Sequence, residues 1–259
     1  MSDILVDVKN LQIAFGGLIA VEDLSFTMKK GEITSLIGPN GAGKTTVINL
    51  LTGFYKPDQG SVELDGKNII GLSSDECVKT GICRTFQNIR LFHNMSVLDN
   101  ILIGMQEWVP YGMFLSIFPN KRKREAEKEA HEKAVALLEK VGLVDYMNHK
   151  ATNLPYGMQR KLEIARALAS HPKLLLLDEP AAGMNPQESA ELSEFVRSLL
   201  NDVDGILLIE HDMKVVMGIS DKVVVINHGS KICEGTPTEV QHNPKVIEAY
   251  LGRGGKRNA

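Results

Sequence analysis

The residues with the clearest chemistry form the stretch "GPNGAGKT", residues 38 to 45, which matches the G-x-x-x-x-G-K-[ST] spacing of a phosphate-binding loop. The glycines let backbone N–H groups turn inward around phosphate oxygens. Lys44 can then reach the terminal phosphates, and the Thr45 hydroxyl can hold Mg2+. The following helix adds its positive N-terminal end. We therefore expect a nucleotide and Mg2+ at this loop and helix start, held by Gly38, Asn40, Gly41, Ala42, Gly43, Lys44, Thr45 and Thr46.

A second informative stretch is "LLLLDEP", in which two adjacent acids follow four leucines. The apolar run predicts a buried strand that delivers Asp178 to the carboxyl end of a sheet, where it can hold Mg2+ directly or through water. Glu179 can orient and polarise an attacking water as a general base. Adjacent acids at a strand end can instead cap the next helix. The phosphate-binding loop makes the catalytic interpretation the stronger one.

Two further polar side chains follow apolar stretches. "LLIEHD" places His211 after a buried strand, which we expect beside the other buried strands, so that the imidazole lies near the terminal phosphate. "RTFQNIRLF" places Gln87 where its amide can contact Mg2+ or the attacking water. Taken alone, such a histidine is more often structural and such a glutamine lies on the surface. Their functional interpretation depends on the other motifs.

Hydrophobic periodicity predicts the elements that position these groups. The first 30 residues alternate apolar and polar residues, which indicates antiparallel strands, and residues 61–66 resemble an edge strand with a turn. We expect a buried strand at 32–38, a helix at 45–52 that Gly53 ends, and further buried strands at 173–178 and 205–210 with a helix between them. Strands that alternate with helices favour a parallel α/β sheet.

The remaining elements are a long helix and a hairpin. From about residue 121 we expect a helix with an apolar stripe of Ala130, Ala134, Leu137, Leu138 and Val141, and an ion pair between Glu129 and Lys133. We interpret its run of charges as a solvated helix face. Residues 222–236 predict a hairpin that turns at 227–229.

Composition excludes several classes of protein. The 259 residues include 29 basic and 32 acidic side chains, which gives no general basic character for nucleic-acid binding. Three scattered cysteines without a C-x-x-C pair indicate reduced thiols rather than disulfides or zinc. The N-terminus lacks the apolar stretch of an export signal, and no run of 18 apolar residues could span a membrane. The uncharged segment 108–119 is too short and proline-broken to do so.

The order of the motifs resembles the ATP-binding-cassette (ABC) ATPases: phosphate loop, glutamine, an L-x-x-G-x turn at 154–158, "LLLLDEP" and histidine. The resemblance covers essentially the whole chain. It implies an α/β fold: a P-loop NTPase (RecA-like) core with an N-terminal antiparallel β subdomain and an inserted helical subdomain at about 88–165. Residues 1–259 would form one nucleotide-binding domain with a C-terminal extension at about 238–259. ATP and Mg2+ would be its cofactors.

The resemblance also implies a head-to-tail dimer, in which each ATP lies between one phosphate loop and the partner's L-S-G-G-Q turn. Phe15 would stack on adenine, although it could instead be a core residue of the first hairpin. Pro155, Tyr156 and Gly157 would face the ATP of the partner subunit. Pro155 replaces a serine hydroxyl that, in the family, bonds the γ-phosphate, and proline also lacks an N–H. Either Pro155 only fixes the start of the following helix, or this turn is a weakened lid on the partner's ATP.

Stretches beyond the ATP site resemble one branch, the ATPase subunits of branched-chain amino-acid importers. They include "FGGLIAVEDLSF", "RTFQNIRLF", "YGMQRKLEIARAL", "LDEPAAGMNP" and "EGTPTEVQHNPKVIEAYLG". The branch implies that the chain pairs with itself or another ABC ATPase, binds two membrane permease subunits and serves a periplasmic or extracellular solute-binding protein indirectly. It would lie at the cytoplasmic face of the bacterial inner membrane, held there by the permeases.

Several alternatives stay open at this stage. Within transport, the solute could be urea or another small polar molecule, or the complex could move envelope lipids. Soluble ATPases of DNA repair or translation usually carry two cassettes or long coiled-coil insertions, which this chain lacks. A non-hydrolysing regulatory cassette would not need Lys44, Asp178, Glu179 and His211. Residues 88–92 and 108–119 could contact a permease, or they could close the core of the helical subdomain.

Overall fold

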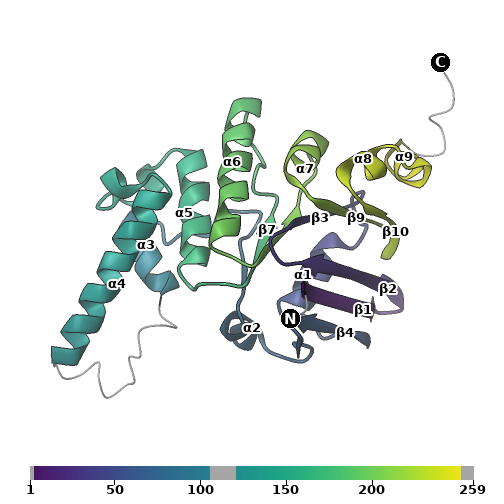
Figure 1. Ribbon diagram of the computed structural model, residues 1–259, viewed down its shortest axis with the longest axis horizontal. Coiled ribbons are helices and arrows are strands. Elements are labelled where there is room, and N and C mark those ends of the chain that lie inside the picture. Colours follow the sequence, from purple (N-terminus) through teal and green to yellow (C-terminus); the bar gives the residue numbers. More distant parts are fainter. Residues whose placement is uncertain (1–2, 106–120, 252–259) are drawn as a thin grey trace. The chain divides into compact units, whose positions relative to one another are not determined.

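The computed structural model describes residues 3–105 and 121–251 (Figure 1). The chain divides into two compact units, the first formed by Met1–Arg84 with Lys173–Ala259 and the second by Thr85–Pro172. The predicted helical subdomain, about 88–165, lies within the second unit. The assignment of the whole chain as one nucleotide-binding domain stays a prediction.

An antiparallel sheet of the first unit confirms the prediction for the N-terminus. Its strands run in the order β2-β1-β4-β5. Their bounds are Ile4–Phe15 for β1, Leu18–Lys29 for β2, Gln59–Leu64 for β4 and Lys67–Asn68 for β5. The strand with a turn predicted at 61–66 is confirmed, but its predicted place at the edge of the sheet was wrong, because β5 pairs with the end of β4. Asp65 and Gly66, with φ of 50° and 76°, form a two-residue turn that brings β5 back.

A second sheet of the first unit has the order β10-β9-β3-β8-β7-β6, in which only β10 is antiparallel to its neighbour. Every residue of β3, β7 and β8 is buried, as the apolar runs predict for a parallel sheet. The three residues of β6 are too few to show a pattern in the sequence. The strands are β3 (Ile33–Ile37), β6 (Ile82–Arg84), β7 (Leu174–Asp178), β8 (Gly205–Ile209), β9 (Lys222–Asn227) and β10 (Ser230–Gly235).

Helices of the first unit follow these strands. They are α1 (Lys44–Leu51), α2 (Ser74–Thr80), α6 (Pro186–Ser198), α7 (Met213–Ile219), α8 (Pro237–Gln241) and α9 (Pro244–Leu251), with a short 3-10 helix at Leu199–Asn201. The predicted helix at 45–52 and its end at Gly53 are confirmed. Gly53 has φ of 70°, and a Cβ there would lie 2.5 Å from the carbonyl oxygen of Leu72. The hairpin of β9 and β10 turns at 227–229 as predicted.

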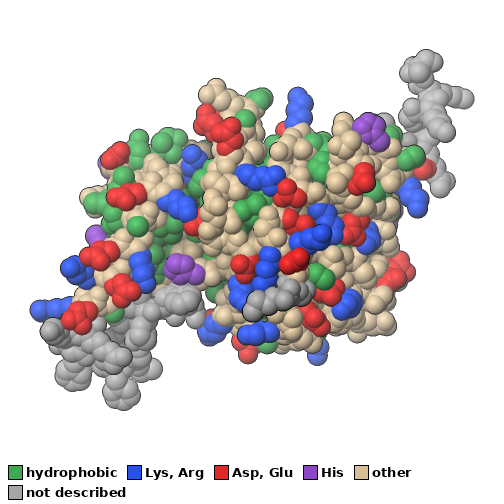
Figure 2. All heavy atoms as spheres, in the orientation of Figure 1, with side chains coloured by type: hydrophobic (Ala, Val, Ile, Leu, Met, Phe, Trp, Pro, Cys, Tyr) green, Lys and Arg blue, Asp and Glu red, His purple; other side chains and the backbone are tan. Residues whose placement is uncertain are grey.

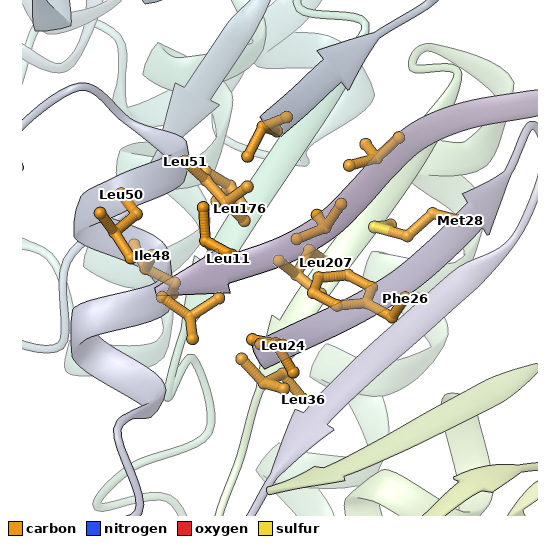
Figure 3. Close-up of a cluster of buried hydrophobic side chains, with 14 of the residues drawn as sticks. Leu11, Leu24, Phe26, Met28, Leu36, Ile48, Leu50, Leu51, Leu176 and Leu207 are labelled. Atoms are coloured by element: carbon orange, nitrogen blue, oxygen red, sulfur yellow. The ribbon is translucent and has the colours of Figure 1, made fainter. Parts of the chain in front are cut away.

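One hydrophobic core joins both sheets of the first unit to α1 (Figure 3). Side chains of β1 and β2 meet apolar residues of α1 and of the parallel strands. The residues labelled in Figure 3 are Leu11, Leu24, Phe26, Met28, Leu36, Ile48, Leu50, Leu51, Leu176 and Leu207. Because this core immobilises both β3 and α1, the loop that connects them is held at both ends.

The second unit is helical among its described residues. It contains α3 (Val97–Gly104), α4 (Lys121–Lys140) and α5 (Tyr156–Leu168), with 3-10 helices at Val144–Tyr146 and Ala151–Asn153. The predicted stripe of α4 is confirmed, with Ala134, Leu138 and Val141 buried. The ion pair between Lys133 and Glu129 is formed at 2.8 Å. Acidic and basic side chains lie next to one another on the exposed face of α4 (Figure 2), so the charged run is a solvated helix face.

Three further expectations concern cysteines and membranes. Cys77, Cys83 and Cys233 are free thiols, as expected. Over residues 3–105 and 121–251, no helix combines the length and apolar character needed to cross a membrane. The segment 108–119 lies outside the described residues.

Candidate functional site

Residues 38–43 form a tight loop between β3 and α1. Gly41 and Gly43 have φ of 78° and 103°, which glycine adopts without strain. A Cβ on Gly38 would lie 2.2 Å from the carbonyl oxygen of Ile226, and one on Gly43 would lie 2.6 Å from that of Ala20. Glycine is therefore needed at both places for the loop to pack on β9 and β2. The phosphate-loop motif has the strand–loop–helix setting that its mechanism requires.

Lys44 folds back over this loop. Its Nζ donates hydrogen bonds to the carbonyl oxygens of Gly38, at 2.7 Å, and Pro39, at 3.0 Å. Burial lowers the pKa of Lys44, while the nearby Glu179 and Asp178 carboxylates raise it. The side chain thus sits in a low-dielectric setting beside two acids and can exchange its carbonyl partners for phosphate oxygens. Asn40 is exposed in the loop, and at the start of α1 Thr45 is exposed and Thr46 is half-buried.

Asp178 ends β7 and is 7% exposed. Its Oδ2 accepts a hydrogen bond from Arg84 Nη2 at 2.8 Å, and Arg84 Nη1 donates to Asn49 Oδ1 at 2.7 Å. This ion pair joins the ends of β6 and β7 to α1. The sequence analysis did not predict Arg84 as the partner of Asp178. The available signal was a single arginine that follows two apolar residues in "GICRTF".

Glu179 and His211 come together at the ends of neighbouring strands. The prediction that the strand before His211 lies beside the other buried strands is confirmed, since β8 lies between β3 and β7. His211 Nε2 lies 2.6 Å from Glu179 Oε1. Glu179 has φ of 48°, a left-handed conformation that is unfavourable for a non-glycine residue. The alternative that the two acids cap the next helix was wrong, because Asn185 caps α6.

Glu210 is a buried carboxylate that sequence reasoning missed. It is 4% exposed, and its oxygens accept hydrogen bonds from the backbone N–H groups of Ala181, at 2.8 Å, and His211, at 3.1 Å. Burial raises the pKa of Glu210, and the charge on Glu179 adds to that rise. Glu210 thereby connects the backbone after Glu179 to that of His211. In the sequence, the available signal for Glu210 was an acid between the apolar residues "LLI" and His211.

Phe15 lies at the end of β1 and is 44% exposed. The alternative that it belongs to the core of the first hairpin was therefore wrong. Its ring lies edge-on to that of Tyr55, with centroids 5.1 Å apart. An exposed aromatic pair offers a π-face to a ligand. The stacking of Phe15 on adenine stays a prediction, and Tyr55 was not singled out from the sequence.

Gln87 and the turn at 154–158 belong to the second unit. Gln87 is exposed, and its backbone carbonyl accepts a hydrogen bond from Arg160. Pro155 is the N-cap of α5, with φ of −54° and no side-chain capping bond, and Tyr156 begins the helix. A Cβ on Gly157 would contact nothing within 4 Å, so packing within the chain does not require glycine there.

The residues present fit Mg2+ bound together with a nucleotide. Within the described ranges, no group of three or more His, Cys, Asp or Glu side chains could hold a metal ion on its own. Mg2+ instead uses one or two carboxylates together with phosphate oxygens and water. Asp178 supplies a carboxylate and Thr45 an exposed hydroxyl, both hard oxygen ligands.

Comparison with known proteins identifies the family. A model of the family described as "ABC transporter" matches residues 21–182. The chain belongs to the ABC transporter family. It is thus an ABC ATPase with a P-loop NTPase fold that binds nucleotide, and ATPase subunits of this family work with membrane permease components. A second family model, "Branched-chain amino acid ATP-binding cassette transporter", matches residues 230–256 of this ABC ATPase.

Individual relatives of this ABC ATPase match it over nearly its full length. It is 48% identical over 253 residues to the high-affinity branched-chain amino acid transport ATP-binding protein LivG of Salmonella typhimurium, covering 97% of this chain and 99% of that protein. BraF of Pseudomonas aeruginosa, described in the same words, is 45% identical with the same coverage. The ADP conformation of an ATP-binding cassette of an ABC transporter superimposes with a TM-score of 0.84 at 34% identity, covering 97% of this chain and 100% of the other.

Proposed function

We propose that this ABC ATPase is the ATP-hydrolysing subunit of an importer for branched-chain amino acids. The observation that carries the proposal is the 48% identity to LivG over 97% of the chain and 99% of that relative. The match of residues 230–256 to a branched-chain amino-acid cassette family supports the same branch, because it lies outside the ATP-binding motifs.

In this proposal, the first unit performs hydrolysis. Lys44 and the backbone N–H groups of residues 40–46 hold the phosphates and offset the negative charge that develops on the γ-phosphoryl group. Glu179, held by the 2.6 Å contact with His211, orients the attacking water and accepts its proton. Asp178 and Thr45, with Gln87, would hold Mg2+, which would supply positive charge that offsets the charge of the phosphates. Phe15 would stack on the adenine ring.

The subunit would work with a second ATPase subunit, two permease subunits and a solute-binding protein. Pro155, Tyr156 and Gly157 would face the ATP of a partner subunit, either a second copy of this chain or another ABC ATPase, and closure of the dimer on ATP would drive rearrangement of two permease subunits. The complex would lie at the cytoplasmic face of the cell membrane and receive solute from a binding protein. The open space around Gly157 supports a turn that faces another molecule.

Reconstitution tests this function directly. The chain is co-purified with the membrane subunits encoded beside it, placed in vesicles, and assayed for ATP hydrolysis with leucine, isoleucine, valine or urea and the cognate binding protein. We expect branched-chain amino acids to stimulate hydrolysis. The Glu179→Gln variant should retain bound ATP and stop turnover. Stimulation by urea but not by leucine would reject the proposed solute, and hydrolysis that persists in Glu179→Gln would reject Glu179 as the base.

A further inference from the structure

The second unit buries an ion pair that hydrolysis at the phosphate loop does not use. Arg160 is 0% exposed and Glu163 is 1% exposed, and Arg160 Nη1 donates to Glu163 Oε2 at 2.8 Å. Removal of two charges from water is unfavourable unless further hydrogen bonds satisfy the remaining polar atoms. The partners of those atoms therefore indicate what the pair holds in place.

Most of these partners belong to one backbone segment. We call residues 86–90 the glutamine segment, because it carries Gln87. Arg160 Nη1 donates to the carbonyl oxygen of Phe86 at 2.8 Å, and Nη2 donates to that of Gln87 at 2.7 Å. Glu163 Oε1 accepts a hydrogen bond from the backbone N–H of Arg90 at 3.0 Å. Both members of this ion pair thus hold the main chain on each side of the Gln87 side chain.

The same guanidinium also contacts the turn at 154–158, which we call the signature turn. Arg160 Nη2 donates to the Tyr156 hydroxyl at 3.3 Å, and Gln159 Nε2 donates to the carbonyl oxygen of Leu154 at 2.8 Å. Arg160 therefore contacts the glutamine segment and the signature turn through one planar, rigid group. A guanidinium with this many fixed acceptors has few other orientations.

We propose that Arg160 is a positioning residue that fixes the glutamine segment to the signature turn, so that both move as one element. This inference rests on the proposed function, in which Gln87 faces the ATP of its own subunit and the signature turn faces that of the partner. Movement of Gln87 when ATP and Mg2+ bind at one site is then transmitted through Arg160 to the turn that covers the other site. The buried pair with Glu163 keeps the guanidinium in place during that movement.

Two substitutions test the role of Arg160. Arg160→Lys keeps the charge but cannot reach both carbonyl groups. The double variant Arg160→Met/Glu163→Met removes both charges, so that neither is left buried alone, and it can fold even if the single change cannot. Arg197→Met is the matched control, because that guanidinium pairs with Asp221 at an exposed position of α6. Urea unfolding of each variant identifies those with native stability.

The readouts separate positioning from stability. In the assembled transporter, kcat for ATP should fall about 2- to 30-fold in the double variant and less in Arg160→Lys, with KM for ATP within about twofold of wild type. The affinity of the isolated subunit for ATP without Mg2+ should be unchanged, because the phosphate loop belongs to the first unit and Gln87 would act through Mg2+. Hydrogen exchange at the backbone amide of Arg90 should accelerate in the double variant. Arg197→Met should change none of these quantities.

Two outcomes would overturn this inference. One is an unchanged kcat in a stable double variant whose Arg90 amide exchanges faster. The other is a loss of affinity for ATP without Mg2+ in the isolated subunit that accounts for the whole effect. Failure of the proposed function would look different, because the wild-type complex would then show no ATP hydrolysis that responds to branched-chain amino acids.

Discussion

The ion pair between Arg84 and Asp178 gives the sharpest test of how the first unit holds the carboxylate that we propose as a Mg2+ ligand. Their side chains are 9% and 10% exposed, and the two groups lie 2.8 Å apart. Arg84→Met replaces the guanidinium with a shorter, unbranched apolar side chain and leaves the carboxylate buried. Loss of one partner from a buried pair costs about 3–5 kcal/mol, because the remaining charge lacks both water and a counter-ion.

Two contacts in the structure place the expected loss of unfolding free energy in Arg84→Met at the lower end of that range. The Lys44 ammonium interacts electrostatically with Asp178 and compensates part of its charge. Asn49, which loses a donor, is half-buried and can hydrogen-bond to water instead. We therefore expect a loss of about 3 kcal/mol in the free energy of unfolding. With a urea m-value of about 3 kcal/mol/M, the midpoint should fall by about 1 M.

Urea unfolding followed by circular dichroism measures this loss. Asp178→Asn in the Arg84→Met background removes the unpaired charge, so the double variant should be less destabilised than the sum of the two single changes. Arg197→Met, which breaks an exposed pair, should cost at most about 1 kcal/mol. The reasoning is refuted if Arg84→Met costs no more than Arg197→Met, or if the two changes at Arg84 and Asp178 are additive.

The remaining predictions concern single side chains. Lys44→Ala should weaken ATP binding itself, which calorimetry on the isolated subunit measures; unchanged affinity would contradict its assigned role. Phe15→Ala should raise the ATP dissociation constant by a factor equivalent to about 1–3 kcal/mol if the ring stacks on adenine. Hydrogen bonds from Lys173 and Lys30 lower the pKa of Asp65 to about 2, from 3.8. Its contribution to stability is therefore present above about pH 4 and lost as the pH falls toward 2, so Asp65→Asn should destabilise the protein at pH 7 but not at pH 2.

Local sequence patterns predicted the elements that carry the site. The mostly apolar stretches of β3, β7 and β8 are long enough to be recognised as buried strands. Close backbone contacts require glycine at Gly38 and Gly43 of the loop at 38–43. The positions of Asp178 and His211 at strand ends then follow from the common direction of parallel strands. These features depend on neighbours in the sequence or on the regular geometry of a sheet.

Partners that lie far apart in the sequence could not be predicted in the same way. Arg84 is 94 residues from Asp178, and Arg160 is 73 residues from Gln87. A charged residue within an apolar pattern signals that a partner exists, but periodicity does not say where. The two-residue strand β5 was missed for a different reason, because a dipeptide has no period. The sequence thus predicts which groups can do chemistry better than it predicts which groups hold them.

Pro155 shows how the structure sharpens a question that the sequence raised. It is the N-cap of α5, a position that serine favours because its hydroxyl accepts a hydrogen bond from an N–H group of the first turn. In Pro155→Ser, the new hydroxyl can therefore bond to its own helix or to the γ-phosphate of the partner's ATP. The first outcome raises the free energy of unfolding by about 0.5–2 kcal/mol. Loss of the proline constraint on the unfolded chain offsets about 0.4–1 kcal/mol of that gain.

The ATPase rate of the assembled transporter separates the two interpretations of Pro155. If the signature turn is a weakened lid, Pro155→Ser should raise kcat, whereas a proline that only fixes the helix start predicts a change in stability alone. Pro155→Ala is the matched control, because it restores the backbone N–H without a hydroxyl. A higher ATPase rate in both variants would show that the missing backbone N–H of Pro155 weakens the lid. A higher rate in Pro155→Ser alone would show that the missing hydroxyl does. An unchanged or lower rate in Pro155→Ser would reject the weakened lid.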